Sequence, residues 1–128
     1  MPVTMRAIKM MNIEAPIVLK IAAEKFPQAI VGKIWRYLSD RTPNGDAGRF
    51  QTDVDKIELG APAALDGKLF LVEGVVLHQN DNPPTSYEVM VTVQQGNFIL
   101  HQEVPQEQGS GRISNQDMTF QYRFTLVK

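Results

Sequence analysis

Apolar residues recur at intervals of four along the first third of the chain, with charged residues between them, and this spacing predicts a helix. Asn12 suits the N-cap position, and Pro16 is tolerated in a first turn. Pro27 falls inside the pattern, so we expect a kink or two helices of about 12–14 residues over about 13–40. Segment 42–48, rich in Gly, Pro and Asn, ends the helical part at residue 41. The recurring positions are Ile13, Ile17, Ile21, Ile30, Ile34 and Leu38.

After residue 48 the pattern changes to alternation, which predicts an antiparallel sheet over 49–128. One segment, 68–78, is apolar at both odd and even positions, as a central strand is. Two other segments are joined by the short connection Gln95-Gly96, which predicts a hairpin. The predicted strands cover 50–59, 68–78, 86–94, 97–104 and 118–126.

The remaining segments are less regular. Residues 1–12 form either an arm or an edge strand, because their alternation is weak. Segment 60–67 is a loop, with or without one helical turn, and 80–84 is a turn. Segment 105–116 is predicted to be a mobile loop because residues 106–111 are polar and rich in Gly.

A helical part followed by about five strands predicts a single α+β domain over residues 1–128, with the helix packed on a curved antiparallel sheet. This order of elements resembles that of cystatin-like and nuclear-transport-factor-like domains. The resemblance concerns the order of elements alone, since the chain matches no sequence motif of a family.

Composition limits the classes of function. The chain has 128 residues, of which 43% are hydrophobic and 21% charged, as expected for one globular domain. It has no Cys, which excludes disulfides, thiol nucleophiles and Cys-based metal sites. The net charge of −1 argues against a dedicated nucleic-acid binder. Residues 1–41 carry seven basic and three acidic side chains (+4), whereas the rest carries six and eleven (−5).

Sequence features favour a cytoplasmic location; the alternative is a mature secreted protein whose signal has been removed, which would have the same features. Residues 1–12 contain no apolar core or cleavage site of a secretory signal. The longest mostly apolar stretch, 15–23, is interrupted by Lys20 and is far shorter than the roughly 20 residues that span a bilayer. We therefore expect no contact with a membrane.

Glu73 is the first candidate for chemistry. Strict alternation places it on the same strand face as Leu71 and Val75, in the core, where it could act as a general base in a lyase or isomerase. Tyr87, Tyr122 and His78 would then orient the substrate in an apolar pocket. A β-bulge at Gly74 would instead turn the carboxylate outward, and we favour this alternative because it removes a buried charge.

A second candidate set lies on the predicted polar face of the sheet: His78, Glu88, His101 and Glu103. These are metal-ligand types, but the predicted stagger separates the imidazoles, so a solvated face with a His–Glu pair is favoured. Asp53 and Asp55 are too common a pattern to indicate a carboxylate site. Phosphate-loop, dinucleotide, zinc-protease, calcium-loop and nucleophile-elbow motifs are missing, so no metal or cofactor is expected.

The sequence favours a non-catalytic protein-binding or assembly module, such as a subunit, adaptor or inhibitor. The predicted helix is apolar on nearly all sides, which exceeds the need of one sheet face and suggests an interface. Lys20, Lys33, Trp35 and Arg36 are the candidate binding residues for an acidic partner. The partner is another protein or a second copy of the chain, joined through the helix or a sheet edge. The alternative is a pocket protein for an apolar ligand, with or without catalysis by Glu73.

Overall fold

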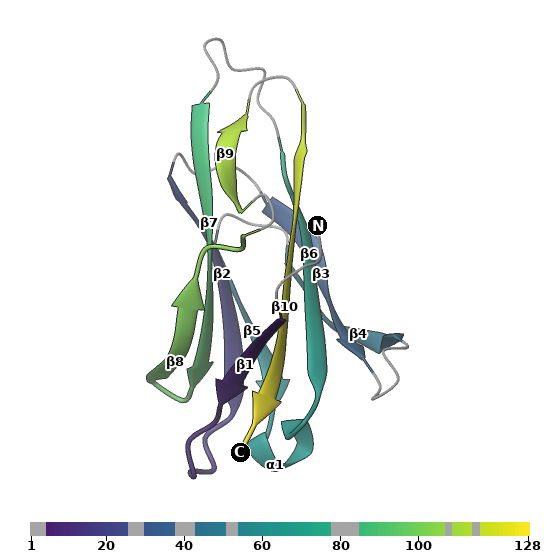
Figure 1. Ribbon diagram of the computed structural model, residues 1–128, viewed down its shortest axis with the longest axis vertical. Coiled ribbons are helices and arrows are strands. Elements are labelled where there is room, and N and C mark those ends of the chain that lie inside the picture. The colour runs from purple at the N-terminus through teal and green to yellow at the C-terminus, as the bar shows by residue number, and fades with distance from the viewer. Residues whose placement is uncertain are drawn as a thin grey trace.

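The computed structural model describes residues 5–25, 30–37, 43–50, 54–77, 85–106, 109–113 and 116–128. These residues form two five-stranded β-sheets that lie face to face, and one short helix (Figure 1). The core residues come from both sheets, so the fold is a β-sandwich. The elements are β1 (Met5–Lys9), β2 (Ile17–Lys25), β3 (Ile30–Tyr37), β4 (Pro43–Phe50), β5 (Val54–Gly60), α1 (Pro62–Leu65), β6 (Leu69–Val76), β7 (Thr85–Gln95), β8 (Phe98–Glu103), β9 (Ser110–Ile113) and β10 (Met118–Val127).

Sheet A has the strand order β1–β10–β6–β3–β4. Its neighbouring strands are antiparallel except for β1 and β10, which run parallel from Met5 opposite Arg123 to Lys9 opposite Val127. Parallel strands cannot be joined by a tight turn. This pair accordingly brings together strands from near the two ends of the printed sequence.

Sheet B has the strand order β5–β2–β7–β8. The long strand β7 pairs with β8 along its C-terminal half and with β9 along its N-terminal half, from Thr85 to Glu88. Strand β2 occupies one side of β7, so β8 and β9 follow one another along the other side, and β8 forms an edge of the sheet.

The core lies between the sheets because alternate residues of each strand point inward. In β10 these are Phe120, Tyr122, Phe124 and Leu126, each at most 4% exposed. The ring of Phe124 stacks on Phe70 of β6, with 5.2 Å between the ring centroids. Burial of large apolar side chains on both inner faces supplies the main stabilisation of such a fold.

The predicted α+β fold is wrong. Residues 17–25 and 30–37 form β2 and β3, so no helix over 13–40 covers the sheet. An interval of four residues fits a strand as well as a helix, because four is a multiple of two. Leu19 separates the two cases: in a helix it would point away from Ile17 and Ile21, but all three are completely buried. The proposed kink at Pro27 lies outside the described residues.

The position of β2 in its sheet explains why the predicted helix had apolar residues on nearly all sides. Strand β2 lies between β5 and β7 in the middle of sheet B, and a central strand needs few polar positions. Both β2 and β3 are rich in Ile and Val, which favour strands. The excess therefore belongs to a sheet interior and is no indication of a helical interface.

Two segments predicted as irregular contain strands. Segment 42–48 includes most of β4, at an edge of sheet A, where Pro43 is tolerated as the first strand residue. Segment 105–116 contains β9, which pairs with β7, so the whole segment is not a mobile loop. Here Gly111 allows a close approach, since a Cβ atom on it would lie 3.3 Å from the Tyr87 ring.

Other predicted elements correspond to observed ones. Strand β6 is central in sheet A, β10 has the expected inward face, and β7 and β8 form the expected hairpin, whose turn is Gly96-Asn97 and not Gln95-Gly96. Strand β5 covers most of 50–59, α1 is the single helical turn within 60–67, and β1 is the edge-strand alternative for residues 1–12. The predicted turn at 80–84 lies outside the described residues. In the described part of the chain, no helix reaches the length and apolarity that crossing a membrane requires.

Candidate functional site

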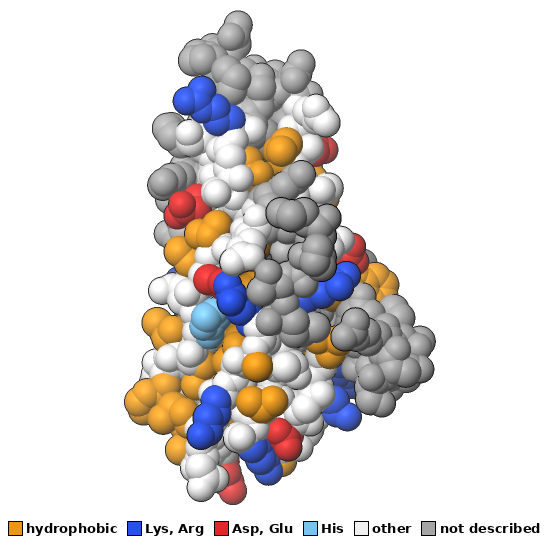
Figure 2. Space-filling model, viewed as in Figure 1, with side chains coloured by type: hydrophobic (Ala, Val, Ile, Leu, Met, Phe, Trp, Pro, Cys, Tyr) orange, Lys and Arg blue, Asp and Glu red, His pale blue; other side chains and the backbone are white. Residues whose placement is uncertain are grey.

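Four large apolar side chains are exposed among the described residues, and all four lie at one end of the sandwich. Phe98 and Ile99 at the start of β8 are 56% and 58% exposed, and Met11 and Ile13 in the loop between β1 and β2 are 40% and 39% exposed. Figure 2 shows apolar side chains gathered at the lower left, over the β7–β8 hairpin of Figure 1. We call these four residues the apolar tip.

The buried amide of Gln95 holds the two parts of the apolar tip together. Its side-chain oxygen accepts a 2.7 Å hydrogen bond from the Met11 N–H, and its nitrogen donates to the carbonyl oxygens of Met11 (3.2 Å) and Ile13 (3.0 Å). The Gly96 N–H donates to the Pro16 carbonyl at 3.0 Å. The loop backbone is thus fixed to the hairpin turn, while the Met11 and Ile13 side chains stay in solvent.

A β-bulge in β8 determines which side chains face inward. Val93 pairs with His101, but Gln94 pairs with Ile99, so Leu100 is the extra residue on β8. Beyond the bulge, Phe98 lies opposite Gln95 and Ile99 opposite Gln94. Phe98 and Ile99 are both more than half exposed at this end of the sheet.

A groove of about 1160 Å³ adjoins the apolar tip. One wall is the loop after β1, which includes Met11 and Ile13, and the other is formed around the start of α1. Its rim carries the lysines Lys9 and Lys128 and one carboxylate, Glu14. The residues that line it are Lys9, Met10, Met11, Asn12, Ile13, Glu14, Ala61, Pro62, Ala63 and Lys128.

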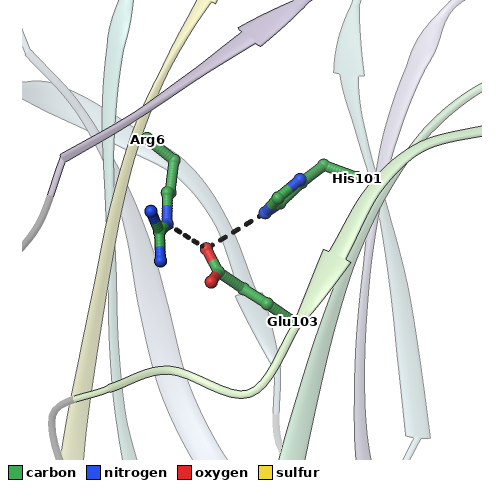
Figure 3. A network of polar contacts seen from close by, with 3 residues as sticks. All are labelled: Arg6, His101 and Glu103. Atoms are coloured by element: carbon green, nitrogen blue, oxygen red, sulfur yellow. Dashed lines mark hydrogen bonds and ion pairs between the residues drawn. The ribbon is translucent and has the colours of Figure 1, made fainter.

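A polar cluster joins the edge strands of the two sheets (Figure 3). Arg6 of β1 donates from Nε to the Glu103 carboxylate of β8 at 2.8 Å. The Nε2 atom of His101 lies 3.1 Å from the same oxygen. Because Glu103 pairs with Val91 and His101 with Val93, both side chains share the inner face of sheet B. The bulge thus turns His101 and Glu103 toward the inside of the sandwich, whereas the sequence pattern predicted them on an outer polar face.

The environment of Glu103 keeps it ionised. Burial alone would raise the pKa of its carboxyl, but Arg6, Tyr122 and His101 outweigh burial and hold this pKa below its ordinary value of 4.5. Burial, together with the nearby carboxylate, raises the pKa of the Tyr122 phenol. The Tyr122 hydroxyl is buried and lacks a partner at hydrogen-bonding geometry. The cluster is suited to joining the two sheets rather than to accepting a proton near neutral pH.

Among the described residues of the predicted catalytic pocket, Glu73 does not meet Tyr87 or Tyr122. Glu73 lies on the outer face of sheet A, where Gln121 Nε2 is 3.4 Å from its carboxylate, and the registers through Gly74 show no bulge. Regular alternation places Phe70 and Val72, not Leu71, with the core, and this turns Glu73 outward. Tyr122 lies on the inner face of sheet A. His78 lies outside the described residues.

Tyr87 lies in the other sheet, on the inner face of β7, and burial raises the pKa of its phenol. Both tyrosines point into the core between the sheets, whereas Glu73 points away from it, so the three side chains do not converge. Glu88 belongs to β7, where it lies opposite Lys25 of β2 and Ser110 of β9. It is on the other face of the strand from Tyr87. In the described part of the chain, no group of three or more His, Asp or Glu side chains could hold a metal ion.

The predicted binding residues separate into three places. Lys33 and Trp35 share the outer face of β3, with the Lys33 ammonium 3.9 Å from the Trp35 ring centroid. Arg36 follows on the other side of β3, opposite Phe70. Lys20 belongs to sheet B, between Lys56 and Thr92. Asp53 lies outside the described residues, and Asp55 belongs to β5 opposite Ile21.

Comparison of the chain with protein-family models, curated proteins and solved structures found no match. The candidate site consequently rests on geometry alone. Sequence reasoning missed the apolar tip, Gln95 and Arg6. One signal was present: three consecutive apolar residues, Phe98 to Leu100, follow a tight turn, and strict alternation can bury them on one face only.

Proposed function

We propose that this protein is a non-catalytic protein-binding or assembly module, and that the apolar tip with the adjoining edge of β8 is its docking surface. The observation that carries the proposal is the gathering of Met11, Ile13, Phe98 and Ile99 at one end of the sandwich. Large apolar side chains clustered on a surface mark interaction sites more often than scattered ones do.

The way the tip is built supports this reading. Gln95 uses a completely buried amide to fix the backbone of Met11 and Ile13. A loop fixed before binding loses less conformational entropy when a partner arrives, which favours affinity. The edge of β8 adds backbone N–H and C=O groups that can pair with another strand, the recognition mode called β-augmentation.

A photo-crosslinking experiment tests the proposal. A benzophenone amino acid replaces Asn97, which is exposed beside Phe98, and the protein is illuminated in an extract of cells that naturally produce it. The matched control carries the same group at Lys56, an exposed residue of β5 at the opposite edge of sheet B. We expect a defined crosslinked polypeptide from position 97 only, lost in the F98S/I99S double variant. Equal crosslinking from both positions, or none from position 97, would overturn the proposal.

A second candidate function is the binding of an apolar ligand in the groove beside α1. The observation that favours it is the volume of about 1160 Å³, with Met11, Ile13 and Pro62 among the lining residues. An environment-sensitive apolar dye should then bind with one-to-one stoichiometry and lose affinity in Ala63→Glu, which adds a charge to the wall. Unchanged dye affinity in that variant would exclude the groove as the site.

A further inference from the structure

We infer that the groove beside α1 binds a single-chain amphiphile with an anionic head, whose alkyl chain lies against the apolar lining while its head meets Lys9 and Lys128. This inference rests on the second candidate function, because it names the chemical class of the ligand for that groove. Three properties of the groove favour this class: its lining is mostly apolar, its charged side chains sum to a positive charge, and its walls are fixed before a ligand arrives.

Most of the side chains that line the groove are apolar. Met10 is 4% exposed and Pro62 is buried, whereas Met11 and Ile13 are 40% and 39% exposed. An alkyl chain in the groove would therefore take apolar surface of Met11 and Ile13 out of water. Methionine side chains are flexible enough to adapt to such a chain. The volume of about 1160 Å³ is above the roughly 300–1,000 Å³ of most ligand sites, so it does not restrict the ligand to a short chain.

The charged side chains of the lining are the ammonium groups of Lys9 and Lys128 and one carboxylate, Glu14, which leaves a net charge of +1. Lys9 lies opposite Val127 in the parallel β1–β10 pair, so the two lysines come from adjoining ends of neighbouring strands (Figure 1). Such strands are about 4.8 Å apart, and lysine side chains are flexible, so both ammonium groups can reach one head group. In the described part of the chain, neither ammonium group takes part in an ion pair. An anionic head is therefore attracted to this end of the groove, and a cationic head is repelled.

Hydrogen bonds fix both walls of the groove to the sandwich. The Gln95 amide holds the backbone of Met11 and Ile13 in the loop wall. On the side of α1, the Gly67 N–H donates to the Leu126 carbonyl at 2.6 Å, which ties the segment after α1 to β10. A groove with fixed walls loses little conformational entropy on binding, so contacts with one alkyl chain and one head group yield more of their energy as affinity.

The test compares three ligands that share a decyl chain and differ in the head group: decanoate is anionic, decan-1-ol is neutral and decyltrimethylammonium is cationic. Titration calorimetry with the full chain at pH 7 measures their affinities, below the concentrations at which they form micelles. Because an exposed ion pair changes affinity by a few fold, we expect decanoate to bind about tenfold more tightly than decyltrimethylammonium, with decan-1-ol between them. Since salt screens exposed charges, this ratio should fall toward one as the salt concentration rises.

Charge reversal locates the head group. In the K9E/K128E double variant the order of affinities should reverse, so that decyltrimethylammonium binds more tightly than decanoate. The matched control is K20E/K56E, which changes the net charge by the same amount at two residues that lie opposite each other on β2 and β5 and do not line the groove. This control should keep the wild-type order. Far-UV circular dichroism should show the same sheet content in all three proteins.

Equal affinities of wild type for the three head groups, or an order that K9E/K128E leaves unchanged, would overturn the inference. If the apolar dye still loses affinity in Ala63→Glu while the head group makes no difference, the groove binds apolar ligands and only the ligand class is wrong. If dye affinity is also unchanged in Ala63→Glu, the second candidate function fails as well. Absence of binding by all three decyl compounds would likewise overturn the inference, and the groove would then belong to the protein-docking surface beside it.

Discussion

At the scale of single residues, the side chain of Gln95 determines how the loop between β1 and β2 is held. It is completely buried, yet its amide oxygen and nitrogen are both used in hydrogen bonds to the loop between β1 and β2. Buried polar groups are tolerated when they are satisfied in this way. Nothing in a linear pattern marks Gln95, because the groups that it binds lie more than 80 residues away in the chain.

Replacement of Gln95 by Leu should therefore destabilise the protein and loosen the apolar tip. The Met11 N–H and two carbonyl groups would lose their partners, at a cost of about 1–3 kcal/mol in the free energy of unfolding. Urea denaturation measures the loss, and hydrogen exchange at Met11 should become faster. Gln102→Leu is the matched control, since Gln102 is exposed and its amide makes one hydrogen bond within the described part of the chain, to Thr92 at 2.9 Å. Equal losses in the two variants would contradict this role for Gln95.

At the scale of elements, strand β2 shows why the predicted helix failed. Ile17 and Ile21 satisfy both a four-residue and a two-residue period, so only the intervening Leu19 can distinguish them. Its complete burial follows from pairing with β5 and β7, which come from much later in the chain. Local periodicity does not contain this information. By contrast, β10 alternates over its whole length, and no other period fits it.

Leu19→Ala should consequently be costly. Removal of a completely buried Leu side chain leaves a cavity between the sheets and should lower the free energy of unfolding by about 2–5 kcal/mol. Val18→Ala, on the outer face of the same strand, should cost much less. Urea denaturation of the two variants measures the difference. Equal costs would contradict the burial of Leu19 between the two sheets.

Strand β8 shows a different limit of sequence reasoning. The hairpin itself was predictable from Gln95-Gly96, because a glycine with positive φ suits a tight turn, and Gly96 has φ of +59°. The bulge at Leu100 was not predictable, since one extra residue shifts the faces without changing composition. That shift moved His101 and Glu103 inward. The inward position of these two residues thus depends on the strand register, which the sequence pattern does not contain.

At the scale of the whole molecule, the two sheets are held at one side by a polar bridge between edge strands. Arg6 belongs to sheet A and Glu103 to sheet B, and their 2.8 Å hydrogen bond lies where the apolar core ends. Arg6 is followed by Ile8 and Met10, which are buried in the core. The bridge therefore fixes β1, and with it the start of the loop that carries Met11 and Ile13.

This bridge predicts a specific dependence of stability on pH. The pKa of Glu103 is lower in the folded protein than its ordinary value of 4.5, so the ionised carboxylate favours the folded state. Its contribution is fully present above about pH 4.5 and is lost as the pH falls through the lowered pKa of the folded state. The difference in unfolding free energy between wild type and Glu103→Gln should thus be largest near pH 7 and should shrink below pH 4.5.

Urea denaturation at pH 7, 5, 4 and 3 measures this difference directly. The other carboxylates are present in both wild type and Glu103→Gln. Their contributions therefore cancel when the unfolding free energy of the variant is subtracted from that of wild type. Glu58→Gln, at an exposed position of β5, is the matched control and should run parallel to wild type. A difference for Glu103→Gln that stays constant down to pH 3 would mean that its carboxylate does not stabilise the fold through its charge. The bridge would then act by packing alone, and Arg6→Met, which keeps the side-chain length without the charge, should leave stability unchanged.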